Sequence, residues 1–285
     1  LDLPVLAYFV LINSSYLLLI ALAAWQFTHQ LRRTGHAGRE ETLGSQLAPG
    51  VSLVVPMHNE QAGIVGSVRS LLALRYPRHE VVVVDDGSTD GTAAALDRLA
   101  AAGLPVRRVA HARSLGQSAA LWSGVRAARG AIIVTLDGDG QNDPAPIPQF
   151  LASFDEPLVG LAAGQRVGRK ATFAKSIGSR LANGIRGALL KDNTRDTGCG
   201  IKAFRREAFL RLPYFQTMHR FLPALFLGDG WRVVHIDVTD RARRHGTSNY
   251  GNLDRLLVGL PDLFGVWWLI RRRRKNPMSA EHPAP

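Results

Sequence analysis

Between residues 51 and 135, short strand-like runs alternate four times with stretches whose apolar residues recur at helical spacing. The runs are VSLVVP, EVVVVD, PVRRVA and AIIVTL, and most of their residues are apolar or β-branched. A helix that connects two neighbouring strands makes them parallel, and a parallel sheet is covered by helices on both faces. The alternation therefore predicts an α/β fold with a mostly parallel sheet and helices on both faces.

Polar clusters follow three of these strands where each strand ends. They are residues 58–60 (HNE), 85–88 (DDGS) and 137–139 (DGD). In open α/β sheets, ligands bind in the crevice beyond the carboxyl ends of the strands. We therefore expect the three clusters to converge on one cleft.

The third cluster places two carboxylates, Asp137 and Asp139, one residue apart at the end of a buried strand. No phosphate-binding Gly-rich motif follows the first strand, so a bound phosphate needs another source of positive charge. Mg²⁺ and Mn²⁺ prefer carboxylate oxygens and are often completed by substrate phosphates. The sequence thus predicts Mg²⁺ or Mn²⁺ at this pair. The glycines at 138 and 140 leave the backbone open to a ligand.

The N-terminal segment carries no charged residue from Leu3 to Phe27, which is long enough to cross a bilayer. The basic stretch HQLRRTGHAGR follows it. The positive-inside rule then places the rest of the chain in the cytoplasm. We expect a transmembrane anchor over 1–30, a basic and polar linker over 31–50, and a location in the inner (cytoplasmic) membrane. A cleaved signal peptide and a buried core helix are the alternatives.

The C-terminal segment, 251–285, is apolar and then strongly basic. Pro261-Asp262 interrupts its apolar part, and a Trp267-Trp268 pair stands near the basic cluster at 271–275. Tryptophan beside basic residues is typical of the headgroup layer of a membrane. We expect an interfacial helix with a basic tail, and the alternative is a helix docked on the domain with a solvated tail.

The net charge of +12 predicts an acidic partner. The two membrane-like ends favour an anionic membrane surface and a phosphorylated substrate. Nucleic acid is not expected, because the sequence has no zinc-ligand spacing and no RNA-binding aromatic motif. Cys199 is the only cysteine, so an internal disulfide is excluded.

The motifs VVPMHNE, VVVVDDGSTDGT and LDGDGQNDP, in this order, resemble the family 2 glycosyltransferases, which have the Rossmann-like GT-A fold. The later motifs GQRVGRK, SRLANGI, RDTGCGIKAFRRE and RRHGTSNYG resemble the dolichol-phosphate mannosyltransferase branch and its bacterial polyprenyl-phosphate relatives. The resemblance covers about residues 50–270. It implies a GT-A catalytic domain over 51–250.

The resemblance also implies roles for single residues. The nucleotide-sugar pocket would be lined by Pro56, His58, Glu60, Val84, Asp86 and Gly138. Asp137 and Asp139 would hold the diphosphate and its metal, with Gln141 as a further ligand. These two aspartates, with Arg166 and Arg243 near the phosphates, would form the catalytic set.

For the acceptor, the resemblance implies a phosphate site formed by Arg169, Arg180, Ser248 and Asn249. The family usually has Lys where Asn249 stands and often Tyr where His58 stands. Asp196 falls near the place where many relatives have a catalytic base. It could instead cap a helix beginning near Lys202.

The activity that the resemblance implies is metal-dependent, inverting transfer of one sugar from a GDP- or UDP-linked donor to a polyprenyl phosphate at the cytoplasmic face of the membrane. A processive polysaccharide synthase is one alternative, although its Q-x-x-R-W motif is absent from this sequence. A non-catalytic membrane protein that binds nucleotide sugars is the other.

Overall fold

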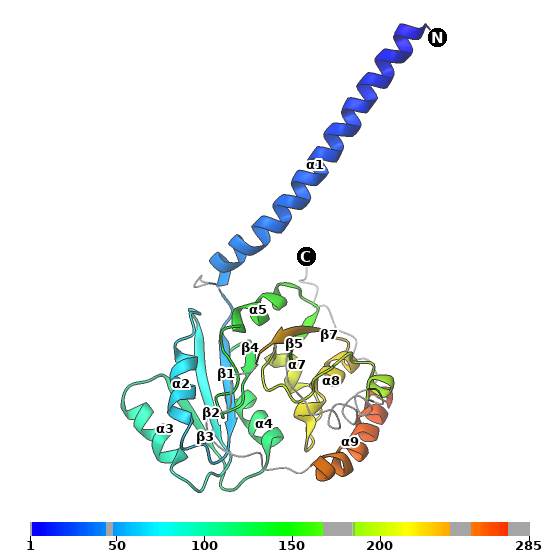
Figure 1. Cartoon of the computed structure of the whole chain (residues 1–285). Helices are drawn as coiled ribbons and strands as arrows, with labels where there is room; N and C mark the ends of the chain where they lie inside the picture. The colour runs from blue at the N-terminus through cyan, green and yellow to red at the C-terminus, as the bar shows by residue number, and fades with distance from the viewer. Residues whose placement is uncertain (1, 44–47, 168–183, 185, 240–251, 273–285) are drawn as a thin grey trace, which may run out of the picture. The chain divides into compact units, whose positions relative to one another are not determined.

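The computed structural model describes residues 2–43, 48–167, 184, 186–239 and 252–272. The chain forms two compact units, Leu1–Ala48 and Pro49–Pro285. The first contains one helix, α1 (Leu3–Leu43), and the second contains the sheet and the remaining helices (Figure 1).

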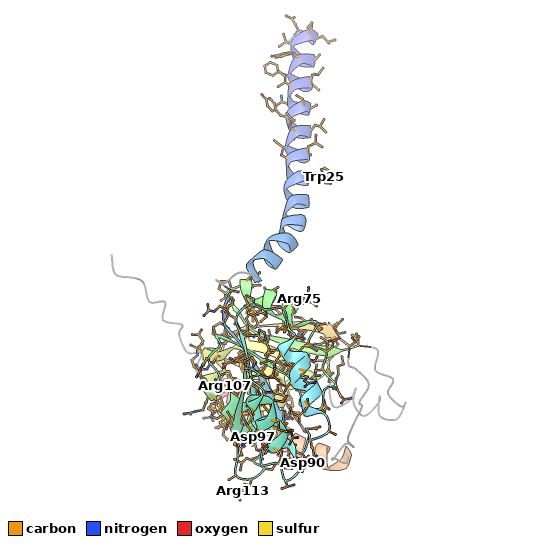
Figure 2. The ribbon with its side chains drawn as sticks, turned by 90° about the vertical axis from the view of Figure 1, so that its left-hand side faces the viewer. Trp25, Arg75, Asp90, Asp97, Arg107 and Arg113 are labelled. Carbon is orange, nitrogen blue, oxygen red and sulfur yellow. The ribbon has the colours of Figure 1, made fainter. Side chains whose placement is uncertain are left out.

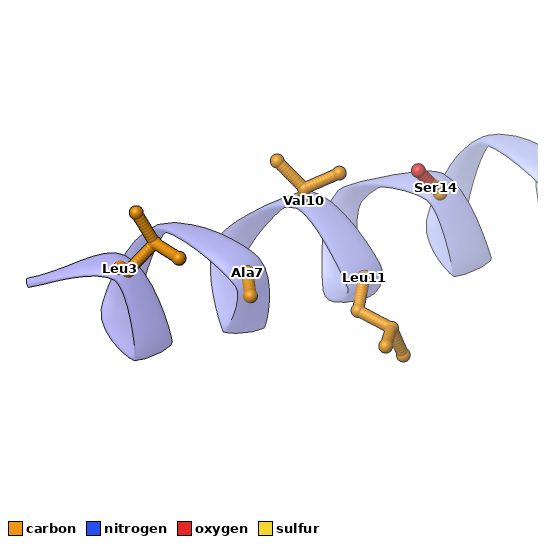
Figure 3. A pocket seen from close by; sticks show the side chains of 5 residues that line it. All are labelled: Leu3, Ala7, Val10, Leu11 and Ser14. Atoms are coloured by element: carbon orange, nitrogen blue, oxygen red, sulfur yellow. The ribbon is translucent and has the colours of Figure 1, made fainter.

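Helix α1 has an apolar part, Leu3–Ala23, that is long and apolar enough to cross a membrane. Figure 3 shows one of its faces, lined by side chains three and four residues apart. The helix continues to Leu43, so residues 31–43 of the predicted linker are helical. Helix formers such as those of REETL explain this extension.

The sheet of the second unit has seven strands in the order β3-β2-β1-β4-β6-β5-β7. The strands are β1 (Val51–Met57), β2 (His79–Asp85), β3 (Val106–Ala110), β4 (Ile132–Thr135), β5 (Val159–Arg166), β6 (Lys202–Arg205) and β7 (Arg232–Val238). Strand β6 runs antiparallel to both of its neighbours, and every other pair is parallel. The predicted mostly parallel sheet is confirmed.

Helices cover both faces of this sheet (Figure 1). They are α2 (Ile64–Leu72), α3 (Thr92–Ala101), α4 (Gln117–Ala127), α5 (Ile147–Ala152), α7 (Arg206–Leu210), α8 (Leu222–Gly228) and α9 (Asn252–Arg272), with short 3₁₀ turns η1 (Ser153–Asp155) and η2 (Met218–Arg220). Val54 and Val84 pack against α4 at Gly124, where a methyl group would come within 2.8 Å of both side chains. Residues 81–84 are completely buried, which explains why the middle of β2 is an unbroken run of valine.

Helix α9 is continuous through Pro261. Leu263 and Val266 are buried in the core cluster that also contains α8, so the helix is docked on the domain. Phe264 and Trp268 nevertheless remain 56% and 54% exposed. One face of α9 therefore packs on the domain, as the alternative prediction expected. The opposite face leaves aromatic side chains exposed.

Candidate active site

The carboxyl ends of β1 and β2 lie side by side, because the parallel register pairs Met57 with Asp85. Directly beyond them, the Asp86 N–H donates to the Met57 carbonyl at 2.9 Å, and His58 Nδ1 donates to the Asp86 carbonyl at 2.9 Å. Figure 2 shows Asp90 and Arg113, which follow β2 and β3, at one end of the domain and Arg75 near the other. The first two polar clusters therefore meet at one edge of the sheet.

The loop after β1 is fastened to the loop after β2. Asn59 has a left-handed backbone (φ 56°), and its N–H donates to Ser88 Oγ while its side-chain oxygen accepts from the Thr89 N–H. The Glu60 N–H donates to Thr92 Oγ1 at 3.0 Å. The positions of His58 and Glu60 thus depend on the second loop, and their contacts with a nucleotide stay predictions.

Asp86 is a buried carboxylate that organises the loop before α4. It accepts hydrogen bonds from His111 Nδ1 and the Ser114 hydroxyl, and from the N–H groups of Leu115 and Gly116, at 2.7–2.9 Å. Burial acts to raise the pKa of Asp86, but these donors outweigh it and the pKa lies below its ordinary value. Since a carboxylate has about four acceptor sites, Asp86 is saturated within the chain. The predicted contact with base and ribose would have to share these sites.

The metal candidates lie beyond β4 and next to β1. Gln117 Nε2, from the first turn of α4, donates to Asp137 Oδ1 at 3.2 Å. Asp139 Oδ1 accepts from the Gln141 N–H at 3.0 Å. Gly138 packs against the end of β1, where a methyl group would lie 2.9 Å from Met57 Cβ and 3.2 Å from the Pro56 carbonyl oxygen. The third polar cluster therefore joins the other two at the same edge.

The donor chemistry of this pair fits a hard divalent cation. Across the described part of the chain, no group of three His, Cys, Asp or Glu side chains could hold a metal. A cation on Asp137 and Asp139 would then complete its coordination with water and substrate phosphate, which is the usual arrangement for Mg²⁺. Gln141 as a side-chain ligand stays a prediction.

A segment distant in sequence, residues 196–202, lies against Asp137. A methyl group on Gly200 would come within 2.2 Å of Asp137 Oδ2, and Thr135 Oγ1 donates to the Gly200 carbonyl at 2.8 Å. Lys202, buried at the start of β6, donates from Nζ to the Cys199 carbonyl. Burial lowers the pKa of Lys202, and the charge of Asp137 acts in the opposite direction. The buried Lys202 side chain therefore lies near the Asp137 carboxylate.

Arg166, at the end of β5, forms a bidentate ion pair with Asp196. Its Nε donates to Oδ2 at 2.6 Å and its Nη2 to Oδ1 at 2.9 Å. Burial acts to raise the pKa of Asp196, but the guanidinium outweighs it and holds the pKa below its usual range. Asp196 is thus ionised and occupied by an arginine. The helix-cap alternative for Asp196 is wrong, because Lys202 begins a strand.

The family model described as Glycosyl transferase family 2 matches residues 52–212, which is more than half of the chain. The chain belongs to glycosyl transferase family 2. A dodecaprenyl-phosphate galacturonate synthase of Rhizobium johnstonii is 36% identical over 232 residues, 79% of this chain and 68% of the relative. An undecaprenyl-phosphate 4-deoxy-4-formamido-L-arabinose transferase of Edwardsiella ictaluri is 31% identical over 207 residues, 70% of this chain and 63% of the relative. The chain therefore spans roughly two thirds of these curated relatives.

Solved structures show the same fold. A mannosyltransferase of Pyrobaculum calidifontis in complex with GDP-Man and Mn²⁺ superposes with a TM-score of 0.60 at 25% identity, covering 90% of this chain and 76% of the other. A glucosyl-3-phosphoglycerate synthase of Mycobacterium tuberculosis reaches 0.61 at 22% identity, covering 81% and 83%. The GT-A-like fold expected of a family 2 glycosyltransferase is thus confirmed.

Several predicted residues of this family 2 glycosyltransferase lie outside the described residues. They are Arg169, Arg180, Arg243, Ser248 and Asn249.

Three residues that lie beside Asp137 were not predicted from the sequence, namely Gln117, Gly200 and Lys202. Of these, only Lys202 could have been noticed from the sequence, because it stands inside the apolar run IKAF and a lysine is rarely placed in a buried strand.

His219 of the glycosyltransferase, in η2, is a half-buried histidine that contacts the first turn of α4. Its Nδ1 and Ser118 Oγ are hydrogen-bonded at 2.8 Å. Burial, together with the nearby charges of Lys202 and Arg220, lowers the pKa of His219 to about 3. The folded state therefore holds a neutral imidazole throughout the physiological range.

This histidine predicts a loss of stability in mild acid. The unfolded state takes up a proton as pH falls below about 6.5, whereas the folded state does not until about pH 3. Stability from the neutral His219 is present above pH 6.5 and is lost below it, by about 2 kcal/mol at pH 5. Urea unfolding at pH 7.5 and pH 5 should show a smaller difference in His219→Gln than in the wild type. An equal difference in both proteins would show that His219 titrates normally.

Proposed function

We propose that this chain transfers a single sugar, with inversion, from a nucleotide-diphosphate sugar to a polyprenyl phosphate at the cytoplasmic face of the membrane. The observation that carries the proposal is the meeting of Asp137 and Asp139 with the loops after β1 and β2 at one edge of the sheet. The relatives support the acceptor, because both are named for a polyprenyl phosphate. The mannosyltransferase structure with GDP-Man and Mn²⁺ supports a nucleotide-sugar donor.

Asp137 and Asp139 would hold the cation, and Mg²⁺ or Mn²⁺ there would offset the charge that develops on the departing diphosphate. Gln117 orients Asp137 through its side-chain amide. Pro56, His58, Glu60, Asp86 and Gly138 would form the nucleotide-sugar pocket. The predicted contact of Val84 with the base is not part of this proposal, because its side chain is completely buried against α4. Arg166 and Arg243 would add positive charge beside the phosphates, with Asp196 fixing the direction of the Arg166 guanidinium.

A phosphate acceptor relaxes the need for a general base. Polyprenyl phosphate is already ionised at pH 7, so its oxygen can attack the anomeric carbon without giving up a proton in the same step. Attack in line with the leaving diphosphate inverts that carbon. This agrees with an Asp196 that is ion-paired rather than positioned as a base. Arg169, Arg180, Ser248 and Asn249 would bind the acceptor phosphate.

The two ends of the chain would hold the cleft near the lipid. The apolar part of α1 is the proposed anchor in the inner membrane. On α9, Arg271 and Arg272 lie over the Trp267 and Trp268 rings at 4.9 and 5.6 Å. Paired cations and aromatic rings suit the headgroup layer of an anionic leaflet.

The test is transfer of radiolabelled sugar by the purified chain in detergent. Polyprenyl phosphate is incubated with separate GDP- and UDP-linked sugars, with Mn²⁺ or Mg²⁺ present. One labelled lipid carrying one sugar is expected, and EDTA should abolish it until cation is restored. A long polymer would instead identify a polysaccharide synthase. Nucleotide-sugar binding without turnover on any lipid phosphate would identify a non-catalytic binding protein.

A further inference from the structure

The segment Tyr214–Phe221 contacts both α4 and α9, and none of the predicted functions uses it. It runs over the start of α4, where Gln216 Nε2 donates to the Leu115 carbonyl at 3.4 Å. The Tyr214 ring packs on the Trp122 ring of α4 with centroids 5.5 Å apart. Met218, within η2, is completely buried and fixes the segment in the core.

Thr217, in the middle of this segment, is hydrogen-bonded to α9. Thr217 Oγ1 donates to Asp262 Oδ2 at 2.6 Å. Thr217 also has a left-handed backbone, with φ 70°. A β-branched residue rarely adopts this conformation, so its surroundings must hold it there. The hydrogen bond to Asp262 is one of the contacts that do so.

His219, two residues further on, is hydrogen-bonded to the first turn of α4. His219 meets Ser118 twice, through the 2.8 Å bond from its ring and through its N–H, which donates to Ser118 Oγ at 3.4 Å. Gln117 precedes Ser118 and donates to Asp137 Oδ1. A movement of this turn would therefore change the contact that orients a metal carboxylate.

We propose that Thr217 and Asp262 are positioning residues for the metal site. Their hydrogen bond fixes Tyr214–Phe221 on α9, this segment holds the first turn of α4, and Gln117 in that turn orients Asp137. The proposal rests on the proposed function, since it takes Asp137 as a ligand of the cation that binds the donor diphosphate. It also connects α9, whose exposed face carries Phe264 and Trp268, to the donor half of the cleft.

Two matched pairs of variants test the hydrogen bond. Thr217→Val and Asp262→Ala remove it, whereas Thr217→Ser and Asp262→Asn keep a donor and an acceptor in place. Calorimetry on the full chain in detergent would measure the affinity for Mn²⁺ with GDP or UDP, whichever the wild type binds. The first two variants should bind about 3- to 10-fold more weakly, which corresponds to the net contribution of one hydrogen bond. The conservative variants should stay within about twofold.

A control variant far from Thr217 tests whether any surface substitution weakens nucleotide binding. Arg232→Gln removes the exposed ion pair with Glu156 and should leave nucleotide affinity unchanged. A double-mutant cycle then tests the route. In a Gln117→Leu background, Thr217→Val should cause no further loss, because the contact that it disturbs is already gone.

Two results would overturn the inference. Wild-type affinity in Thr217→Val and Asp262→Ala would show that the bond does not position the site. Additive losses in the cycle would show that the effect does not pass through Gln117. A wild-type chain that binds neither nucleotide with Mn²⁺ would overturn the proposed function itself, and the inference with it.

Discussion

Asp139→Asn should lower the rate of sugar transfer by at least about 100-fold while the chain remains folded. The substitution removes a negative charge from the proposed cation site but keeps the size of the side chain. The Asn oxygen can still accept the Gln141 N–H bond that Asp139 Oδ1 accepts now. Transfer measured at saturating Mn²⁺, with the melting temperature of both proteins, checks both parts of this expectation.

The same loop offers a matched control for this variant. Asp143 Oδ1 accepts the Ala145 N–H at 3.0 Å, in the arrangement that Asp139 has with Gln141. Asp143→Asn should therefore keep transfer close to the wild-type rate. Normal transfer in Asp139→Asn, or an equal loss in Asp143→Asn, would show that Asp139 is not a cation ligand.

Gly200→Ala should weaken Mn²⁺ binding by at least about tenfold and lower the free energy of unfolding by about 1–3 kcal/mol. The added methyl group would lie 2.2 Å from Asp137 Oδ2 and 2.7 Å from Asn142 Oδ1, so the carboxylate or the backbone must shift. Mn²⁺ titration and urea unfolding measure the two effects. Gly66→Ala is the control, because a methyl group there would meet no atom within 4 Å.

A double variant tests whether the methyl group of Gly200→Ala clashes with the Asp137 carboxylate. In an Asp137→Ala background the carboxylate is absent, so Gly200→Ala should cost less unfolding free energy than it does in the wild type. The same cost in both backgrounds would assign the effect to the contact with Asn142 and to the backbone around residue 200. The position of Asp137 would then be independent of residue 200.

Much of the fold could be predicted from the sequence because, in the first half of the chain, the local residue patterns match the strands and helices that form. Residues 81–84 are all valine, and their burial on both faces is what a central parallel strand requires. The three polar clusters were predicted to meet because parallel strands end at the same edge. The partners of Asp86 could not be predicted, since its donors come from a loop about 25–30 residues away along the chain.

The second half was harder to predict for a different reason. The contact between Gly200 and Asp137 depends on β6 pairing with β4, and no local pattern encodes a pairing across so long a separation. Helix α9 shows another limit. The same apolar residues suit a protein core and a lipid surface, so the sequence could not say that Leu263 is buried while Phe264 is exposed.

The reversed direction of β6 has a consequence for how the family can change its substrates. Strand β5 ends at Arg166 and β6 begins at Lys202, and both points lie at the edge where Asp137 stands. The chain therefore leaves the sheet after Arg166 and returns to it at Lys202 on the same rim, because β5 and β6 are antiparallel neighbours. A connection between two such points can be lengthened or exchanged between relatives without altering strand order. On the proposed function, the acceptor preference would then change while the strands that carry Asp137 and Asp86 stay the same.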